Sequence, residues 1–242
     1  MKPIPDFVLS GDILLASYPR SGNTWMRYLL ANLLFPDKKW HINNIAQVIP
    51  DLGEPFPDPY LAPSPRIFKT HFPRPVNSCR AIYIYRDGRD VALSFHDYRR
   101  KLRGEEVAFS DFLESMLTNG LKFGSWQSHV DSWMNAASGG SLLPVQYESM
   151  CRDLVAEMRR VAAFLGHTWS EPMILRAAER ASREQIRKHM RWFRSRAYWR
   201  KGYSGGLNKG CGYWREAFDH KLQETFWHHA GETAARLGYS RY

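Results

Sequence analysis

Three short motifs hold the residues whose types and spacing could do chemistry: YPRSGNTW at 18–25, KTHFP at 69–73 and RDGRDVALS at 86–94. In the second motif, His71 could act as a general base, because the ordinary pKa of histidine, about 6.5, suits proton abstraction near neutral pH. Most histidines in proteins are structural or exposed, however, and this chain has nine. His71 is therefore a candidate base that needs support from the other motifs.

The first motif has the features of an anion-binding loop between a strand and a helix. Gly22 lets the backbone approach a ligand closely, and the free N–H groups at the start of a helix favour an anion. Ser21, Asn23 and Thr24 add donors, and Arg20 adds a positive charge. The alternative is an ordinary strand-to-helix turn that Asn23 or Thr24 caps.

The third motif places a serine eight residues after an arginine. Arg86 follows an apolar run and Ser94 lies on the helix expected next, so both side chains could contact one phosphate. The alternative is a surface ion pair of Arg86 with Asp87 or Asp90, which would contribute about 0–1 kcal/mol. This motif alone favours neither interpretation.

Short apolar runs alternate with amphipathic segments along the chain. The runs predict strands at 13–18, 67–70, 81–85 and 142–147. Helical spacing predicts helices at 25–34, from 88 onward, 109–136 with a break near 120–124, 154–165, the start of 176–200, and about 214–237. We therefore expect one α/β domain over residues 1–242, with a central, mostly parallel sheet flanked by helices. Ligands bind such sheets at the carboxyl ends of the strands, where all three motifs begin.

The composition narrows the classes of partner and compartment. Lys and Arg outnumber Asp and Glu by 34 to 24, and this surplus suggests an anionic partner such as a nucleotide, a nucleic acid, an acidic acceptor or a membrane surface. The three cysteines form no CxxC pair, which argues against a disulfide scaffold and a zinc knuckle. No secretory signal or membrane-spanning run is visible, so we expect a cytoplasmic protein with no membrane partner.

The ordered set of motifs closely resembles the cytosolic-type sulfotransferases that use 3′-phosphoadenosine-5′-phosphosulfate (PAPS). That family has a YPKSGTTW-like loop, a KTHLP-like segment and an Arg…Ser pair eight residues apart. Further similar segments are GSWQSHV at 124–130, YESM at 147–150 and RKG at 200–202. The resemblance extends from about residue 13 to 216 and implies a P-loop-kinase-like sulfotransferase fold. It suggests a bacterial enzyme that sulfates a small molecule and leaves 3′-phosphoadenosine-5′-phosphate (PAP).

The resemblance also implies a role for each matching residue. His71 would deprotonate the acceptor, and Lys69 and Arg20 would stabilise charge on the transferring group. Trp25 would stack on adenine and Tyr147 would contact its edge. The 5′-phosphosulfate would be held by Arg20, Ser21, Gly22, Asn23 and Thr24, and the 3′-phosphate by Arg86, Ser94, Arg200, Lys201 and Gly202. A metal is not expected, because side-chain cations suffice for a sulfuryl group and no metal-ligand cluster is visible.

Several positions depart from the family pattern. Arg20 replaces a lysine and keeps the charge, but its guanidinium is a planar fork. Asn23 replaces a threonine, and Arg183 stands where an aromatic ring covers adenine. A glycine-rich insertion at 203–211 is either a lid or a tolerated surface loop. The family's C-terminal dimer motif is not evident, so the oligomeric state stays open.

Three alternatives compete with this interpretation. A P-loop nucleotide kinase would need the GxxxxGK[ST] sequence, which the chain lacks. A nucleic-acid-binding protein could use the basic, aromatic stretch at 183–200, but no recognised binding module is present. The third alternative is a sulfotransferase-like protein without activity. We expect a small aromatic or polycyclic acceptor with a hydroxyl or amine, bound by the segments at 50–65, 95–112 and 203–213, and no nucleic-acid partner.

Overall fold

The computed structural model describes residues 7–41, 44–55, 64–74, 79–118, 121–135, 140–182, 184–186 and 210–242. Four residues expected in the site, Arg183, Arg200, Lys201 and Gly202, lie outside the described residues. Most of the glycine-rich insertion also lies outside them. The predictions made for these positions therefore stay predictions.

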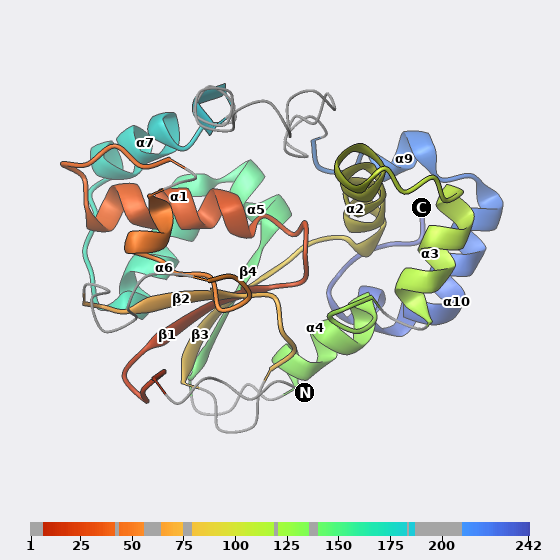
Figure 1. The fold of residues 1–242 in the computed structure, drawn as a ribbon, viewed down its shortest axis with the longest axis horizontal. Helices are drawn as coiled ribbons and strands as arrows, with labels where there is room; N and C mark the ends of the chain where they lie inside the picture. The colour runs from red at the N-terminus through yellow and green to blue at the C-terminus, as the bar shows by residue number, and fades with distance from the viewer. Residues whose placement is uncertain are drawn as a thin grey trace.

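A parallel sheet of four strands forms the centre of the fold (Figure 1). The strands are β1 (Ile13–Ser17), β2 (Ile67–Thr70), β3 (Arg80–Tyr85) and β4 (Leu142–Gln146), in the order β2-β1-β3-β4. Ala16 lies beside Thr70, and Tyr85 lies beside Gln146, so the strands end at one shared edge. This arrangement confirms the parallel α/β sheet predicted from the sequence.

Helices cover both faces of the sheet, because the strands are apolar at nearly every position (Figure 1). One face packs against α1 (Asn23–Leu34), α6 (Leu154–Leu165), α7 (Glu171–Arg180) and the short turn η1 (Ile45–Gln47). The other face packs against α2 (Gly88–Arg103), α3 (Phe109–Leu117), α4 (Trp126–Met134), α9 (Trp214–Ala217) and α10 (His220–Arg236). A further short helix, α5 (Tyr147–Arg152), continues directly from β4.

Several predicted boundaries differ from the structure. The last helix, expected over about 214–237, is divided into α9 and α10, because Phe218 is extended and Asp219 caps a new helix by accepting from the Leu222 N–H. Tyr147, expected at the end of a strand, begins α5. The break expected near 120–124 does separate α3 from α4, and Gly166 does end α6 in the left-handed conformation.

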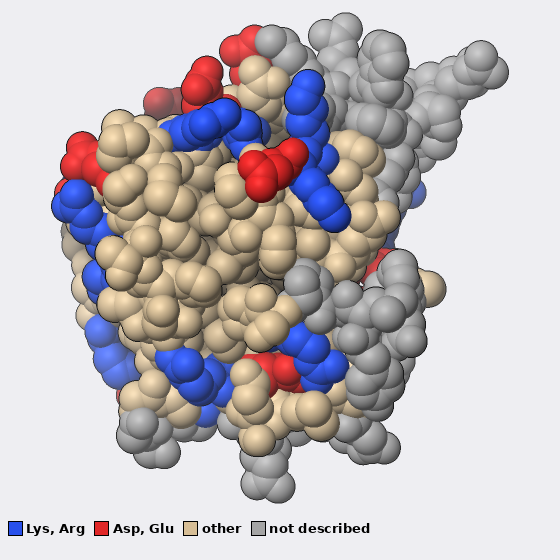
Figure 2. Space-filling view, turned by 90° about the vertical axis from the view of Figure 1, so that its left-hand side faces the viewer, with Lys and Arg blue, Asp and Glu red and all other residues tan. Residues whose placement is uncertain are grey.

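On the face shown in Figure 2, the positively charged side chains form several separate groups. There, Lys and Arg side chains lie in separate groups, some of them beside acidic side chains, with uncharged surface between them. The net charge of +10 therefore does not form one continuous basic surface on this face.

Candidate functional site

The loop between β1 and α1 lies at the carboxyl edge of the sheet. Helix α1 begins after Gly22, whose φ is 105°, and no side chain caps it, so the alternative in which Asn23 or Thr24 serves as a cap is wrong. Asn23 instead turns inward, where its Nδ2 donates to the Leu15 carbonyl at 3.1 Å and to the Ser17 hydroxyl at 3.2 Å. The N-terminal end of α1 is therefore left without a side-chain acceptor of its own.

Ser21 and Arg20 supply two polar groups of this loop. Ser21 is 0% exposed, and its hydroxyl is one of the buried polar atoms without a partner in the described part of the chain. Arg20 has a left-handed backbone (φ 71°), its Nε donates to the Ser94 hydroxyl at 3.2 Å, and its guanidinium lies over the Tyr98 ring. Arg20 and Ser94, predicted to bind the two ends of one nucleotide, are thus in direct contact.

His71 follows β2 and is held as a neutral base. Its Nδ1 lies 2.8 Å from the Ser17 carbonyl oxygen, which can only accept, so Nδ1 carries the proton and Nε2 keeps a free lone pair. Burial, and then the charge of Lys69, hold the pKa of His71 well below 6.5. The imidazole can therefore accept a proton at Nε2 at neutral pH.

His129, on α4, holds the backbone of His71. Its Nε2 lies 3.1 Å from the His71 carbonyl oxygen, and its Nδ1 lies 3.0 Å from the Tyr83 hydroxyl. Nε2 must donate to the carbonyl, so Nδ1 accepts from Tyr83. Both ring nitrogens are occupied, so His129 positions the candidate base. Neither Tyr83 nor Ser17 was predicted for the site; the only sequence signal was His129 within the GSWQSHV segment.

Lys69 is paired with an acidic residue from another segment. Its Nζ lies 2.5 Å from Asp51 Oδ2, and its backbone is bonded to Pro50 and Leu52. Burial lowers the pKa of Lys69, and the Asp51 carboxylate opposes that effect. The predicted role of Lys69 at the transferring group would require its ammonium to act beside this carboxylate.

Arg86 lies where β3, α5 and the chain before α9 meet. Its guanidinium lies over the Tyr147 ring at 4.4 Å, and its NH2 donates to the Gly210 carbonyl at 3.2 Å. The same NH2 lies 3.3 Å from Asp90 Oδ2. The pair with Asp90 exists, but the alternative of a surface ion pair is wrong, because Arg86 is only 4% exposed. Its Nε is buried without a partner among the described residues.

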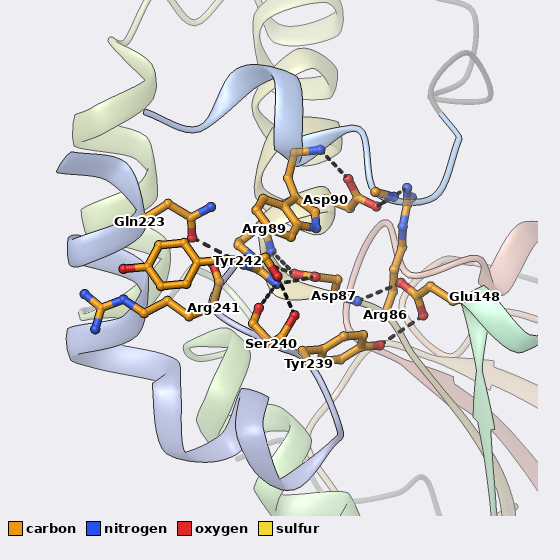
Figure 3. Close-up of polar contacts among 12 residues, drawn as sticks. Arg86, Asp87, Arg89, Asp90, Glu148, Gln223, Tyr239, Ser240, Arg241 and Tyr242 are labelled. Atoms are coloured by element: carbon orange, nitrogen blue, oxygen red, sulfur yellow. Dashed lines mark hydrogen bonds and ion pairs between the residues drawn. The ribbon is translucent and has the colours of Figure 1, made fainter. Parts of the chain in front are cut away.

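The first turn of α2 organises the surroundings of Arg86 (Figure 3). Arg89 donates to Asp87 Oδ2 at 2.8 Å and to the Ser240 carbonyl at 2.8 Å, and its NH1 reaches the Arg241 carbonyl and the Gln223 amide oxygen. Arg89 is 1% exposed. One buried guanidinium therefore joins α2 to α10 and to the chain that follows α10.

Two carboxylates fix the neighbouring segments to α2 (Figure 3). Asp90 accepts from the Gly212 N–H at 2.8 Å and from the Trp214 N–H at 3.0 Å. Glu148 on α5 accepts from the Asp87 N–H at 3.0 Å, and burial raises the pKa of its carboxyl group. The chain that returns from the predicted Arg200–Gly202 motif is thus anchored beside Arg86.

Acidification is expected to destabilise the protein through His71 and His129. Burial lowers the pKa of His129 to about 4, and that of His71 also lies below 6.5. As the pH falls below 6.5, these histidines become protonated in the unfolded chain but stay neutral in the folded chain. Each of them therefore lowers the free energy of unfolding by up to about 1.4 kcal/mol per pH unit. Urea titrations at a series of pH values measure this slope. His129→Gln, which keeps a donor for the His71 carbonyl, should reduce it; an equal slope would contradict the assignment.

Gly22→Ala is expected to lower the stability of the protein. A Cβ at Gly22 would lie 2.9 Å from Tyr147 Cε2 and closer still to Cδ2, in a backbone conformation that alanine adopts at a cost of about 1–2 kcal/mol. Gly166→Ala is the matched control, because Gly166 has a φ of 75° and open space around its Cβ position. Urea titration should show a larger loss for Gly22→Ala, and equal losses would contradict close packing of Tyr147 on Gly22.

The site therefore combines a preoriented neutral imidazole, a loop that leads into a helix start without a side-chain cap, and a buried arginine. Trp25 lies at the same edge, with its ring 5.9 Å from the Tyr147 ring and nearly perpendicular to it. Within the described ranges, no group of three His, Cys, Asp or Glu residues could hold a metal ion. None of the helices in those ranges is long and apolar enough to cross a membrane.

Comparison with known proteins gives consistent matches. Mouse sulfotransferase 1B1 is 29% identical over 198 residues, covering 74% of this chain and 66% of the relative. Human sulfotransferase 1C2 is 24% identical over 240 residues, which cover 89% of this chain and 80% of the relative. The chain thus spans just under two thirds of the length of the mouse relative.

Solved structures show the same fold. Retinol dehydratase in complex with retinol and PAP has a TM-score of 0.73 at 23% identity, with 94% of this chain and 82% of that chain covered. Mouse sulfotransferase SULT7A1 in complex with PAP has a TM-score of 0.68 at 24% identity, with 92% of this chain and 86% of that chain covered. The family model described as the sulfotransferase domain matches residues 10–238, nearly the whole chain. The chain therefore belongs to the sulfotransferase family, as its motifs predicted.

Proposed function

We propose that this chain transfers a sulfuryl group from PAPS to a hydroxyl or amine of a small-molecule acceptor, with His71 as the general base. One observation carries the proposal: a neutral imidazole, whose Nε2 has no partner among the described residues, lies at the same sheet edge as the uncapped start of α1 and a buried arginine. The family membership supports the same reaction class.

The donor nucleotide fits the polar groups that the site leaves unsatisfied. The Ser21 hydroxyl and the Arg86 Nε are buried without partners in the described part of the chain, and phosphate oxygens would satisfy both. Gly22 keeps the loop open where any side chain would meet Tyr147. Arg20, Ser21 and the start of α1 would hold the phosphosulfate, and Arg86 and Ser94 the 3′-phosphate, together with Arg200, Lys201 and Gly202.

The residues of the chain have distinct tasks in this proposal. PAPS, when bound, supplies the sulfuryl group and a phosphate leaving group. His71 Nε2 takes the proton of the acceptor hydroxyl or amine, while the Nδ1–H bond to the Ser17 carbonyl keeps the imidazole in the required tautomer. Arg20 offsets the negative charge that develops as the bond to the leaving oxygen lengthens, and Lys69 would act with it.

The acceptor is proposed to be small and largely apolar. Phe123 lies beside the base, with its ring centroid 5.8 Å from that of His71 and 5.5 Å from that of Phe72. Phe95 and Tyr98 line the adjoining part of α2. Similar structures include retinol dehydratase with retinol and with androsterone, which supports an acceptor of this class. Faster transfer to glycan chains than to every small alcohol, phenol and amine in a broad panel would contradict it.

Calorimetric titration with PAP, ATP and 5′-AMP tests the nucleotide site. PAP is expected to bind about 100-fold more tightly than 5′-AMP, or ~2.7 kcal/mol, which is the scale of charge-assisted hydrogen bonds to one phosphate. Arg86→Gln should remove most of that preference and leave 5′-AMP binding nearly unchanged. Arg160→Gln, at an exposed pair with Glu157, is the control. Equal affinities for PAP and 5′-AMP would contradict the proposed function.

The three cysteines support the cytoplasm as the proposed location. Cys79, Cys151 and Cys211 are all free thiols in the structure. Free thiols persist in compartments that glutathione and thioredoxin keep reduced.

A further inference from the structure

Lys69, two residues before the candidate base, forms a largely buried ion pair with Asp51. Lys69 Nζ lies 2.5 Å from Asp51 Oδ2, and the two side chains are 13% and 16% exposed. The other carboxylate oxygen, Oδ1, accepts from the Gly53 N–H at 2.9 Å. Both oxygens of Asp51 therefore have a donor, and salt screens this pair much less than a pair at the surface.

The backbone fixes Asp51 directly beside Lys69. The Lys69 N–H donates to the Pro50 carbonyl at 2.7 Å, and the Leu52 N–H donates to the Lys69 carbonyl at 2.9 Å. These bonds place Asp51 and Lys69 in a parallel bridge at the outer edge of β2. The position of the carboxylate is therefore set by the chain around it and does not depend on the ion pair alone.

The Lys69 side chain lies on the face of the sheet that α1 covers. Ile67, two residues earlier, packs in the core on that face, and side chains two residues apart on a strand share a face. Arg27, in the second turn of α1, donates from its Nε to the Ile49 carbonyl at 2.8 Å and acts electrostatically on Lys69. The charge of Lys69 in turn acts on His71. The ammonium is thus within electrostatic reach of both α1 and the candidate base.

The groups that face Lys69 compete over its charge. Burial lowers the pKa of Lys69, and the positive charge of Arg27 lowers it further. The Asp51 carboxylate raises this pKa through its charge and its hydrogen bond, and Glu54 adds a smaller effect in the same direction. Without the Asp51 carboxylate, the environment of Lys69 would therefore favour the neutral amine.

We propose that Asp51 is a positioning residue for sulfuryl transfer, which keeps the Lys69 ammonium charged and fixed beside the start of α1. This inference rests on the proposed function, because Lys69 acts on the transferring group only if PAPS binds there. The ammonium would offset the negative charge that develops as the bond from sulfur to the leaving oxygen lengthens. A cation that is already fixed needs no rearrangement during that step, and Asp51 supplies the fixation without contacting either reactant.

Asp51→Asn removes the charge and keeps an oxygen that can accept from the Gly53 N–H. Initial rates should show kcat about 10–100-fold lower, the range for one lost hydrogen bond to a charged group. Titration should show nearly unchanged affinity for PAP, and Asp51→Glu should recover part of the rate because it restores the charge. Asp37→Asn, at an exposed position after α1, is the matched control and should leave kcat unchanged. Wild-type kcat in Asp51→Asn would overturn the proposal.

The pH dependence of kcat distinguishes positioning from a purely structural role. In Asp51→Asn, burial and Arg27 lower the pKa of Lys69 without the opposing carboxylate, so the ammonium is lost at a lower pH. The decline of kcat with rising pH should therefore begin at a lower pH in this variant than in the wild type. A structural role would lower kcat by the same factor at every pH, and such parallel profiles would overturn the proposal.

A second substitution tests whether Asp51 acts through Lys69. In a Lys69→Met background there is no ammonium to hold, so adding Asp51→Asn should not lower kcat further. Urea titration of each variant checks that it is folded under the assay conditions. A further loss as large as that in the wild-type background would overturn the proposal.

Labelling with acetic anhydride separates this inference from the proposed function. The reagent acetylates the unprotonated amine, so the peptide that contains Lys69 should be labelled faster in Asp51→Asn than in the wild type at the same pH. Equal or slower labelling would overturn the role of Asp51. If the wild type neither binds PAP nor transfers a sulfuryl group but labelling is faster in the variant, the proposed function fails and the effect of Asp51 on Lys69 stands.

Discussion

Replacing His71 with asparagine is expected to lower kcat by about 10²–10⁴-fold and to leave the affinity for PAP nearly unchanged. Asparagine keeps an N–H donor that can reach the Ser17 carbonyl, but it has no basic nitrogen at the position of Nε2. The substitution therefore removes the proton acceptor without removing the bond that His71 Nδ1 makes now. Initial rates with an acceptor from the panel, and PAP titration of the same variant, measure the two effects.

The control for this prediction is His129→Gln. Glutamine retains a donor toward the His71 carbonyl, so its kcat should stay within about tenfold of the wild type, the effect of one weakened hydrogen bond. The pH profile gives a second check. Because the pKa of His71 lies well below 6.5, the base stays unprotonated and kcat/KM should remain level as the pH falls from neutrality through 6.5. Near-normal turnover in His71→Asn would assign the base to another group.

Replacing Arg89 with leucine is expected to lower the free energy of unfolding by about 3–5 kcal/mol, the cost of leaving one partner of a buried ion pair alone. Arg89 pairs with Asp87 through two nitrogens, and it is the donor to the Ser240 and Arg241 carbonyls. Its guanidinium also lies 3.4 Å from the centre of the Trp214 ring. Urea titration measures the loss.

Two further variants distinguish the loss of the buried Arg89–Asp87 pair from the general effect of removing one positive charge on the free energy of unfolding. Arg160→Leu removes an exposed pair with Glu157 on α6 and should cost about 0–1 kcal/mol. Adding Asp87→Asn to Arg89→Leu should recover part of the loss, because the unpaired carboxylate disappears. A loss from Arg89→Leu as small as that from Arg160→Leu would show that the contacts in Figure 3 do not hold α2 to α10.

Local patterns predicted the strands and the edge at which the motifs meet. Apolar runs bounded by polar motifs identified all four strands, and in a parallel sheet their ends must lie together, which brought His71, Arg86 and the 18–25 loop to one place. Helix boundaries were predicted less well where a single side chain decides them. Asp219 restarts a helix that the apolar spacing of 214–237 would continue.

The contacts that prepare the site could not be read from local patterns. The bond between His129 and the His71 carbonyl depends on how α4 packs against the end of β2. The pairing of Lys69 with Asp51 joins β2 to the 50–65 segment, for which the sequence predicted only a part in binding the acceptor. The same holds for Ser17, which was part of a predicted strand but whose carbonyl selects the tautomer of His71. Such partners are set by tertiary packing, and residue spacing carries little information about them.

The central position of β1 has a consequence for the timescale on which the candidate base can lose its orientation. β1 lies between β2 and β3, and each of its residues is at most 3% exposed. Backbone amides in such a strand exchange with solvent chiefly through global unfolding. His71 takes its orientation from Ser17, the last residue of this strand. Local openings near the surface that admit and release a nucleotide would therefore leave the base aligned from one turnover to the next.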